Sequence, residues 1–241
     1  MKKLSLINLE LIFDKLKDVD SINYKKINKE TNKLEIKRLE DDELSYKLTD
    51  KILLRYPYLT SLNLRRNMEI KDVRNLKKLK KLDASWYSGI DDEGIKRLKL
   101  MSLIASSNEN IKNVSWMKSL RELDASANSG LNDLGIEGLK LISLSAWNNE
   151  KIKDISGMTS LRKINARGIH CGINDSDIKE LKLIKLNARN NEKIKDVSWM
   201  TSLRELDARG SCGINDKGIK RLKLKRLNAD GNSKITKRED K

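Results

Sequence analysis

The sequence predicts an α/β solenoid, a curved stack of short strand-and-turn coils with a parallel β-sheet on the concave face and a small N-terminal helical cap. A leucine pattern recurs through most of the chain, which is the sign of a repeat array. Aromatic residues make up only 4% of the 241 residues, too few to fill one deep core. The apolar residues are mostly Leu and Ile, spread among charged residues, which suits a thin core extended along one axis.

The repeat has the form Leu-x-x-Leu-x-(Leu or Ala), and its units follow one another at 20 to 22 residues. Within each unit, alternating side chains of a short strand point inward, and neighbouring strands pair in parallel. One unit therefore cannot bury its apolar edge without the next one. The units begin at Leu59, Leu79, Leu100, Leu120, Leu141, Leu161, Leu183, Leu203 and Leu224.

This pattern resembles that of the leucine-rich-repeat family, with Ala in place of the third Leu in most units. Two polar columns follow each predicted strand. We expect an Asn column to satisfy turn backbone groups and an Asp/Asn column to cap the next turn. The Asn column is Asn67, Asn108, Asn128, Asn149, Asn191 and Asn232, and the second is Asp72, Asp92, Asn113, Asp133, Asp154, Asp175, Asp196 and Asp216.

The open face of the predicted sheet carries the best candidate binding site. Its side chains are free to vary without damage to the core, and two outward columns hold Arg, Trp and Asp. Arg and Trp anchor many protein interfaces. We expect a partner-binding stripe on the concave face, although a solvated face with Asp–Arg pairs would look the same. The stripe is Arg65, Trp86, Trp147, Arg167, Arg189, Asp207 and Arg209.

The residues that most often carry chemistry have structural explanations in this sequence. Cys171 and Cys212 share a column with Ser88 and Ser129, so that position needs only a small side chain. His170 is the single histidine, and the repeat geometry implies no Ser or Cys nucleophile with an orienting carboxylate. We therefore expect no enzyme activity, no cofactor and no metal site. Trp116 and Trp199 align with Gly157, which indicates edge packing.

Residues 1–45 do not fit the repeat and form a predicted helical segment, followed by the solenoid at 46–236 and a charged tail at 237–241. The segment from Ile7 to Leu16 resembles a shortened F-box, although the usual Leu-Pro opening is missing. The resemblance implies a substrate receptor of a ubiquitin ligase that binds a Skp-type adaptor through residues 4–30. The alternative is a pair of helices that only cap the stack. The adaptor-binding residues would be Leu9, Leu11, Ile12, Phe13 and Leu16.

The net charge of +16 leaves nucleic acid or another polyanion open as an alternative partner, bound through the concave Arg stripe. No run of about 20 apolar residues is present, so we expect no membrane span. The absence of a cleavable leader pattern favours an intracellular, cytoplasmic protein, for which we expect a monomer with reduced thiols. The Lys-, Asn- and Ile-rich repeats are similar in style to those of giant amoeba-infecting DNA viruses, which would place the protein in the host cytoplasm.

Overall fold

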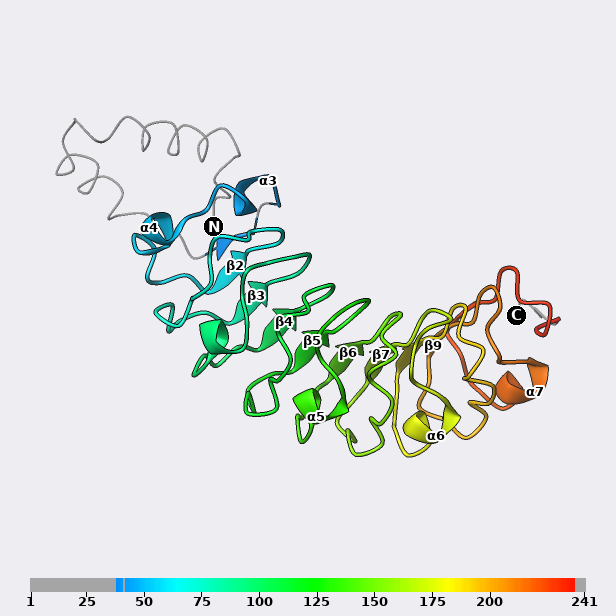
Figure 1. Cartoon of the computed structure of the whole chain (residues 1–241). Helices are drawn as coiled ribbons and strands as arrows, with labels where there is room; N and C mark the ends of the chain where they lie inside the picture. The colour runs from blue at the N-terminus through cyan, green and yellow to red at the C-terminus, as the bar shows by residue number, and fades with distance from the viewer. Residues whose placement is uncertain (1–37, 41, 237–241) are drawn as a thin grey trace, which may run out of the picture. The chain divides into compact units, whose positions relative to one another are not determined.

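The repeats form one parallel sheet in which every strand pairs with the strands before and after it in the chain (Figure 1). This computed structural model describes residues 38–40 and 42–236. The sheet has ten strands, in the order β1 to β10. They are β1 (Arg38–Leu39), β2 (Ser61–Asn63), β3 (Lys81–Asp83), β4 (Ser102–Ile104), β5 (Glu122–Asp124), β6 (Ser143–Ser145), β7 (Lys163–Asn165), β8 (Lys185–Asn187), β9 (Glu205–Asp207) and β10 (Arg226–Asn228).

Each three-residue strand of the repeats places one apolar side chain in the core and the residues on either side of it on the outward face. The central residues pair from strand to strand, as in Leu82 with Leu103 and Leu144 with Ile164. Except in the last strand, these central residues are at most 3% exposed. The first Leu of each unit and the Ala in the third place are likewise buried, except for Leu224 in the last coil, so the core is one thin layer that follows the sheet.

The sheet begins earlier than the repeat pattern indicates. β1 lies within the segment 1–45 that the sequence assigns to helices, and Leu39 pairs with Leu62 of the first repeat. Two short helices, α3 (Asp42–Ser45) and α4 (Asp50–Leu53), connect β1 to β2. The predicted adaptor-binding residues, Leu9 to Leu16, lie outside the described residues.

Coils of two kinds alternate along the stack, and they differ in how they fill the turn after the strand. One kind buries an Asn there, and the other buries a Ser or Cys. We call them Asn coils and Ser/Cys coils. The buried residues are Asn67, Asn108, Asn149, Asn191 and Asn232 in the first kind and Ser88, Ser129, Cys171 and Cys212 in the second.

The buried Asn side chains bond one coil to the coil before it. Asn149 Nδ2 donates to the carbonyl oxygens of Ala125 and Leu131 at 2.7 and 3.3 Å, and its Oδ1 accepts from Lys151 N at 2.8 Å. Asn108, Asn191 and Asn232 repeat this pattern. The expectation that the Asn column satisfies turn backbone groups is confirmed, with one error: Asn128 is exposed, and Ser129 takes the buried place.

Ser/Cys coils carry the helical turns, on the far side of the coil from the strands. These are η2 (Glu93–Ile95), α5 (Asp133–Ile136), α6 (Asp175–Ile178) and α7 (Asp216–Ile219). The three α-helices are capped by Asn132, Asn174 and Asn215, each one residue before the Asp column that was expected to cap them. In these coils the Asp side chains instead reach the next coil, as Asp133 Oδ1 does in accepting from Lys153 N at 2.8 Å. In the Asn coils the same column does cap its own turn, as Asp154 Oδ1 does in accepting from Ser156 N at 3.1 Å.

Among the described residues, no helix combines the length and the apolar character that a bilayer crossing requires.

Candidate functional site

The outward face of the sheet holds the predicted stripe, which the structure divides into two clusters. The first outward position after each strand, two residues beyond its last residue, carries Arg65 at one end and Arg167, Arg189 and Arg209 at the other. Ser85, Ser106 and Ser126 occupy that position in the next three coils, and Trp147 occupies it in the fourth. Three coils span about 14 Å of sheet, so the clusters are separate surfaces.

The C-terminal cluster consists of Trp147, Arg167, Arg189, Asp207 and Arg209, on four consecutive coils. Backbone hydrogen bonds join these coils directly, because Gly168 N donates to Arg189 O and Asn190 N donates to Arg209 O. The guanidinium of Arg167 lies over the Trp147 ring, with its central carbon 5.2 Å from the ring centroid. This contact holds an exposed aromatic side chain and a cation together at the surface.

Asp207 and Arg209 form a two-point ion pair within the C-terminal cluster. Arg209 Nε and Nη2 donate to the two carboxylate oxygens at 2.9 and 2.7 Å. Burial alone would raise the pKa of Asp207, but the hydrogen bonds and charge of Arg209, with the charge of Arg189, hold that pKa below its ordinary value. The carboxylate therefore stays ionised and fixes Arg209, whereas no ion pair is found for Arg189 within residues 42–236.

The N-terminal cluster is Arg65, Arg66 and Trp86, with Asp42 beside it. The guanidinium carbons of Arg65 and Arg66 lie 5.4 and 5.6 Å from the Trp86 ring centroid. Arg65 Nη1 also pairs with Asp42 Oδ2 at 3.3 Å. This cluster thus has the same chemistry as the other, an Arg–Trp stack with one carboxylate.

The surface between the clusters is small, acidic and partly buried. The outward side chains Asp83, Ile104 and Asp124 stand opposite one another on β3, β4 and β5. Burial raises the pKa of Asp124, against the hydrogen bonds from Ser126 and with help from the charge of Asp83. The gap could have been found in the sequence, because three successive Ser interrupt the Arg column.

Both cysteines are buried and free. Burial raises the pKa of the Cys171 and Cys212 thiols to about 11, so each stays protonated at neutral pH and is a poor nucleophile. In the described part of the chain, no three His, Cys, Asp or Glu side chains lie close enough to hold a metal ion. His170 lies exposed on its turn.

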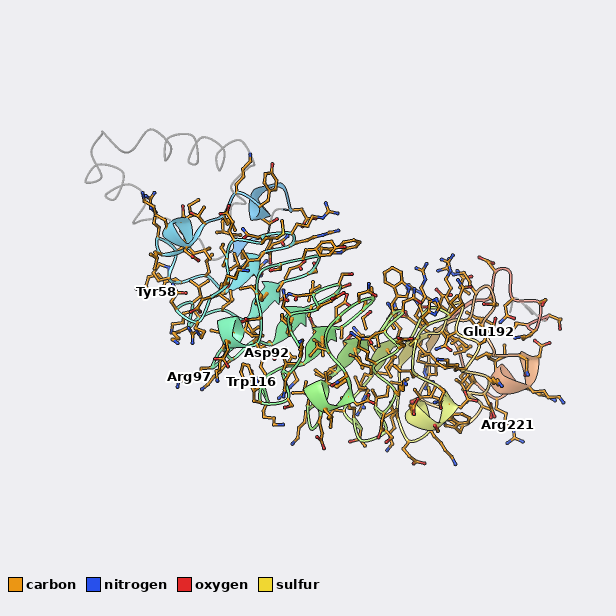
Figure 2. All side chains as sticks on the ribbon, in the orientation of Figure 1. Tyr58, Asp92, Arg97, Trp116, Glu192 and Arg221 are labelled. Carbon is orange, nitrogen blue, oxygen red and sulfur yellow. The ribbon has the colours of Figure 1, made fainter. Side chains whose placement is uncertain are left out.

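The two tryptophans outside the sheet face lie where edge packing was expected. Trp116 projects from the surface on the side of the coils that includes Asp92 and Arg97 (Figure 2). At the equivalent Gly157 an added Cβ would meet nothing within 4 Å, so the position tolerates side chains of very different size. A position that holds Trp in one repeat and Gly in another does not form the same binding site in each repeat.

No protein-family model and no curated protein sequence matches the chain. Among solved structures it is similar to an internalin of Listeria monocytogenes, with a TM-score of 0.51, 25% sequence identity, and coverage of 75% of this chain and 57% of the internalin. It is also similar to TLR13, solved in complex with ssRNA13, with a TM-score of 0.46, 18% identity, and coverage of 71% of this chain and 32% of TLR13.

The chain therefore spans 57% of the internalin's length and 32% of that of TLR13. Both are leucine-rich-repeat proteins, and neither comparison bears on the F-box resemblance. The ten-stranded parallel sheet and the likeness to internalin together give this chain the fold of a curved leucine-rich-repeat solenoid.

Proposed function

We propose that the chain is a protein-binding scaffold and that the C-terminal cluster on the outward sheet face is its main recognition surface. The stacked pair Trp147–Arg167 is the observation that carries this proposal. It presents a rigid aromatic and a cation side by side, the combination that anchors many protein interfaces. Arg189 adds a cation between the stacked Arg167 and the ion-paired Arg209.

A folded protein fits this surface better than a polyanion does. Asp207 lies within the C-terminal cluster, and Asp83 and Asp124 lie on the same face towards the N-terminus. A phosphate backbone would meet these carboxylates as well as the arginines, whereas a protein surface of mixed charge can match both signs. Nucleic acid binding through Arg167, Arg189 and Arg209 is therefore the second candidate.

The test is affinity capture with the full chain as bait and mass spectrometry of what is retained. Replacing Trp147, Arg167 and Arg189 by Ala should reduce the retained partner at least about tenfold, because hot-spot residues of this type each contribute about 2 kcal/mol or more. A matched variant with Lys112, Lys153 and Lys195 replaced by Ala, on the opposite side of the coils, should retain it. Equal losses in both variants, or no loss in the first, would contradict the proposal.

The salt dependence of the captured material distinguishes a protein partner from nucleic acid. Nucleic acid binding should weaken steeply as salt rises, because phosphate contacts release counterions. A protein partner bound around the Trp147–Arg167 stack should survive moderate salt. Retention that follows nucleic acid and disappears after nuclease treatment would replace the scaffold proposal by the second candidate.

We propose further that residues 4–30 bind a Skp-type adaptor, which would make the scaffold a substrate receptor of a ubiquitin ligase within the cell. The support is the sequence resemblance to an F-box alone. In a pull-down with the purified adaptor, the full chain should bind, and the double substitution Leu11→Asp and Phe13→Asp should abolish binding by placing charge in an apolar contact. An adaptor that fails to bind, or that binds the double variant equally well, removes the ligase role and leaves the scaffold proposal intact.

A further inference from the structure

A second surface runs along the edge of the sheet where the chain enters each strand. It is formed by the residue that follows the first Leu of each coil. The backbone of these residues is bonded from coil to coil: Arg121 N donates to Met101 O, Ile142 N to Arg121 O, Arg162 N to Ile142 O, and so on along the edge. The resulting edge ladder is Met101, Arg121, Ile142, Arg162, Ile184 and Arg204.

Apolar and cationic side chains alternate along the edge ladder. Met101, Ile142 and Ile184 belong to Asn coils and are 51%, 45% and 46% exposed. The arginines belong to the Ser/Cys coils between them. Thr60 and Lys225 take this place in the first and last Asn coils, so the apolar residues occupy the three central Asn coils. Three half-exposed apolar side chains, one at every second coil, form a regular apolar surface.

The arginines of the edge ladder are held in place by backbone carbonyls. Arg162 Nη1 donates to Thr159 O at 2.9 Å and to Leu161 O at 2.8 Å. Arg121 and Arg204 make the same two bonds in their own coils. Because Nη1 of each guanidinium is fixed in this way, the side chain is already positioned. It loses little conformational freedom when its other two nitrogens, Nε and Nη2, bind a carboxylate.

A second row of cations lies beside the apolar side chains. In four of the five Asn coils the residue just before the first Leu is an exposed lysine, and the first Asn coil has Tyr58 there: the lysines are Lys99, Lys140, Lys182 and Lys223. With the three arginines this gives one cation per coil over seven successive coils. Across the described coils, no acidic residue stands directly before or directly after the first Leu. An acidic partner would therefore complement the charge of this edge.

We propose that the edge ladder binds an acidic amphipathic α-helix of a protein partner, lying along the stack. Coils repeat at about 4.8 Å and helical turns at about 5.4 Å, so one turn of helix faces one coil. Apolar residues once per heptad then meet Met101, Ile142 and Ile184, and acidic residues half a heptad later meet the arginines. Over the ladder the two lengths are about 24 Å for the coils and about 27 Å for the helix, a difference that flexible side chains absorb.

Two other partners fit the edge less well. A single-stranded nucleic acid would need aromatic side chains on which bases stack, and the ladder has none. A bilayer would need apolar side chains that stand clear of the surface, whereas about half of each ladder side chain is already covered. An acidic helix uses both the carboxylate-binding arginines and the shallow apolar contacts.

The probe is a labelled helical peptide of about three heptads with Leu at the first position and Glu at the fourth, fifth and seventh. Its binding to the full chain is measured by fluorescence anisotropy. A second peptide of the same composition, with the Leu residues moved to five-residue spacing, tests the register. The first peptide should bind at least about tenfold more tightly than the second, because only its apolar side chains coincide with Met101, Ile142 and Ile184.

Two variants test this edge, one at the row of lysines and one at the apolar residues of the edge ladder. Neither changes the arginines that bond to backbone carbonyls. Replacing Lys99, Lys140 and Lys182 by Glu, or Met101, Ile142 and Ile184 by Ser, should each weaken the first peptide at least about tenfold. The control replaces Lys112, Lys153 and Lys195 by Glu, the same change of charge on the far side of the coils, and should weaken binding less than about threefold. Circular dichroism confirms that each variant is folded.

Several results would overturn the proposal. These are equal binding of both peptides, an equal loss in the control variant, or no loss in the serine variant. Tighter binding of phosphatidylserine vesicles or of duplex DNA, removed by the same lysine substitutions, would assign the edge to lipid or nucleic acid instead. Replacing Trp147, Arg167 and Arg189 by Ala should leave peptide binding unchanged, so this proposal and that for the sheet face fail separately.

Discussion

Replacing Asn149 by Leu is expected to lower the free energy of unfolding by about 4 kcal/mol, since two buried carbonyls and one partly buried N–H lose their partner at about 1–3 kcal/mol each. Those groups are the carbonyls of Ala125 and Leu131, which accept from Nδ2, and the N–H of Lys151, which donates to Oδ1. Leu has the same number and branching of side-chain heavy atoms as Asn and leaves no cavity, so the loss comes from unsatisfied hydrogen bonds. Two of the three groups lie in or next to the preceding coil, which weakens the contact between coils.

Urea unfolding followed by circular dichroism measures this change. The control is Asn128→Ala, because Asn128 is exposed and should cost no more than about 0.5 kcal/mol. Asn108→Leu and Asn191→Leu should cost about as much as Asn149→Leu, since their bonds are equivalent. A loss below about 1 kcal/mol for Asn149→Leu would mean that water replaces the amide, contrary to this account.

Replacing Gly135 by Ala is expected to destabilise the protein by about 3 kcal/mol, at the upper end for overpacking. A Cβ at Gly135 would lie 2.2 Å from the carbonyl oxygen and 3.2 Å from the carbonyl carbon of Lys112. Both atoms are backbone of the preceding coil and cannot rotate away, so the coils must move apart. The N–H of Val114 would lose its bond to Gly135 O in the process.

Gly157→Ala is the matched control, because nothing lies within 4 Å of the added Cβ and its φ is not in the left-handed region. It should leave stability unchanged or raise it by about 0.5 kcal/mol, since Ala restricts the unfolded chain more than Gly does. Thermal and urea unfolding of the two variants give the comparison. Equal stabilities would show that the stack yields at Gly135 and that close coil packing is not what keeps glycine there.

The repeat itself could be predicted from the sequence because its leucines are both numerous and strictly periodic. All nine predicted units form strands of the sheet, and their central apolar residues are in register. β1 was missed because its sequence, with Ile36 and Leu39 in the first two places of the pattern, has Asp41 where the other units have Leu or Ala. What makes it a strand is the adjacent β2, whose free edge it covers through the pair Leu39–Leu62.

Errors in the polar columns came from one-residue shifts between the two kinds of coil. Asn128 and Ser129 are adjacent, and only the backbone path of the turn decides which of them is buried. Likewise Asn132 caps α5 although the neighbouring Asp133 aligns with the acidic column, because the helix begins one residue earlier than the column suggests. Local polarity marks such a turn, but its path depends on contacts with the next coil.

The residues of the sheet-face site could be predicted from the sequence, but their division into two clusters and their contacts could not. Alternation along a strand identifies Arg167, Arg189 and Arg209 as outward, whereas the stacking of Arg167 on Trp147 requires knowledge of the rotamers. The edge ladder was missed because the residue after the first Leu is apolar in some coils and Arg in others. When all coils are aligned in one column, this looks like random variation. Only the alternation of coils separates Met101, Ile142 and Ile184 from the arginines between them.

The two kinds of coil also determine how the array can change in length. A buried Asn amide reaches back to carbonyls of a Ser/Cys coil, and a Gly N–H of a Ser/Cys coil reaches back to the backbone carbonyl of an Asn, as Gly130 does to Asn108. Deleting one coil would therefore join two faces of the same kind and leave buried donors or acceptors unmatched. Deleting or inserting two coils preserves every junction, so the unit of growth for an engineered or natural variant of this stack is the pair.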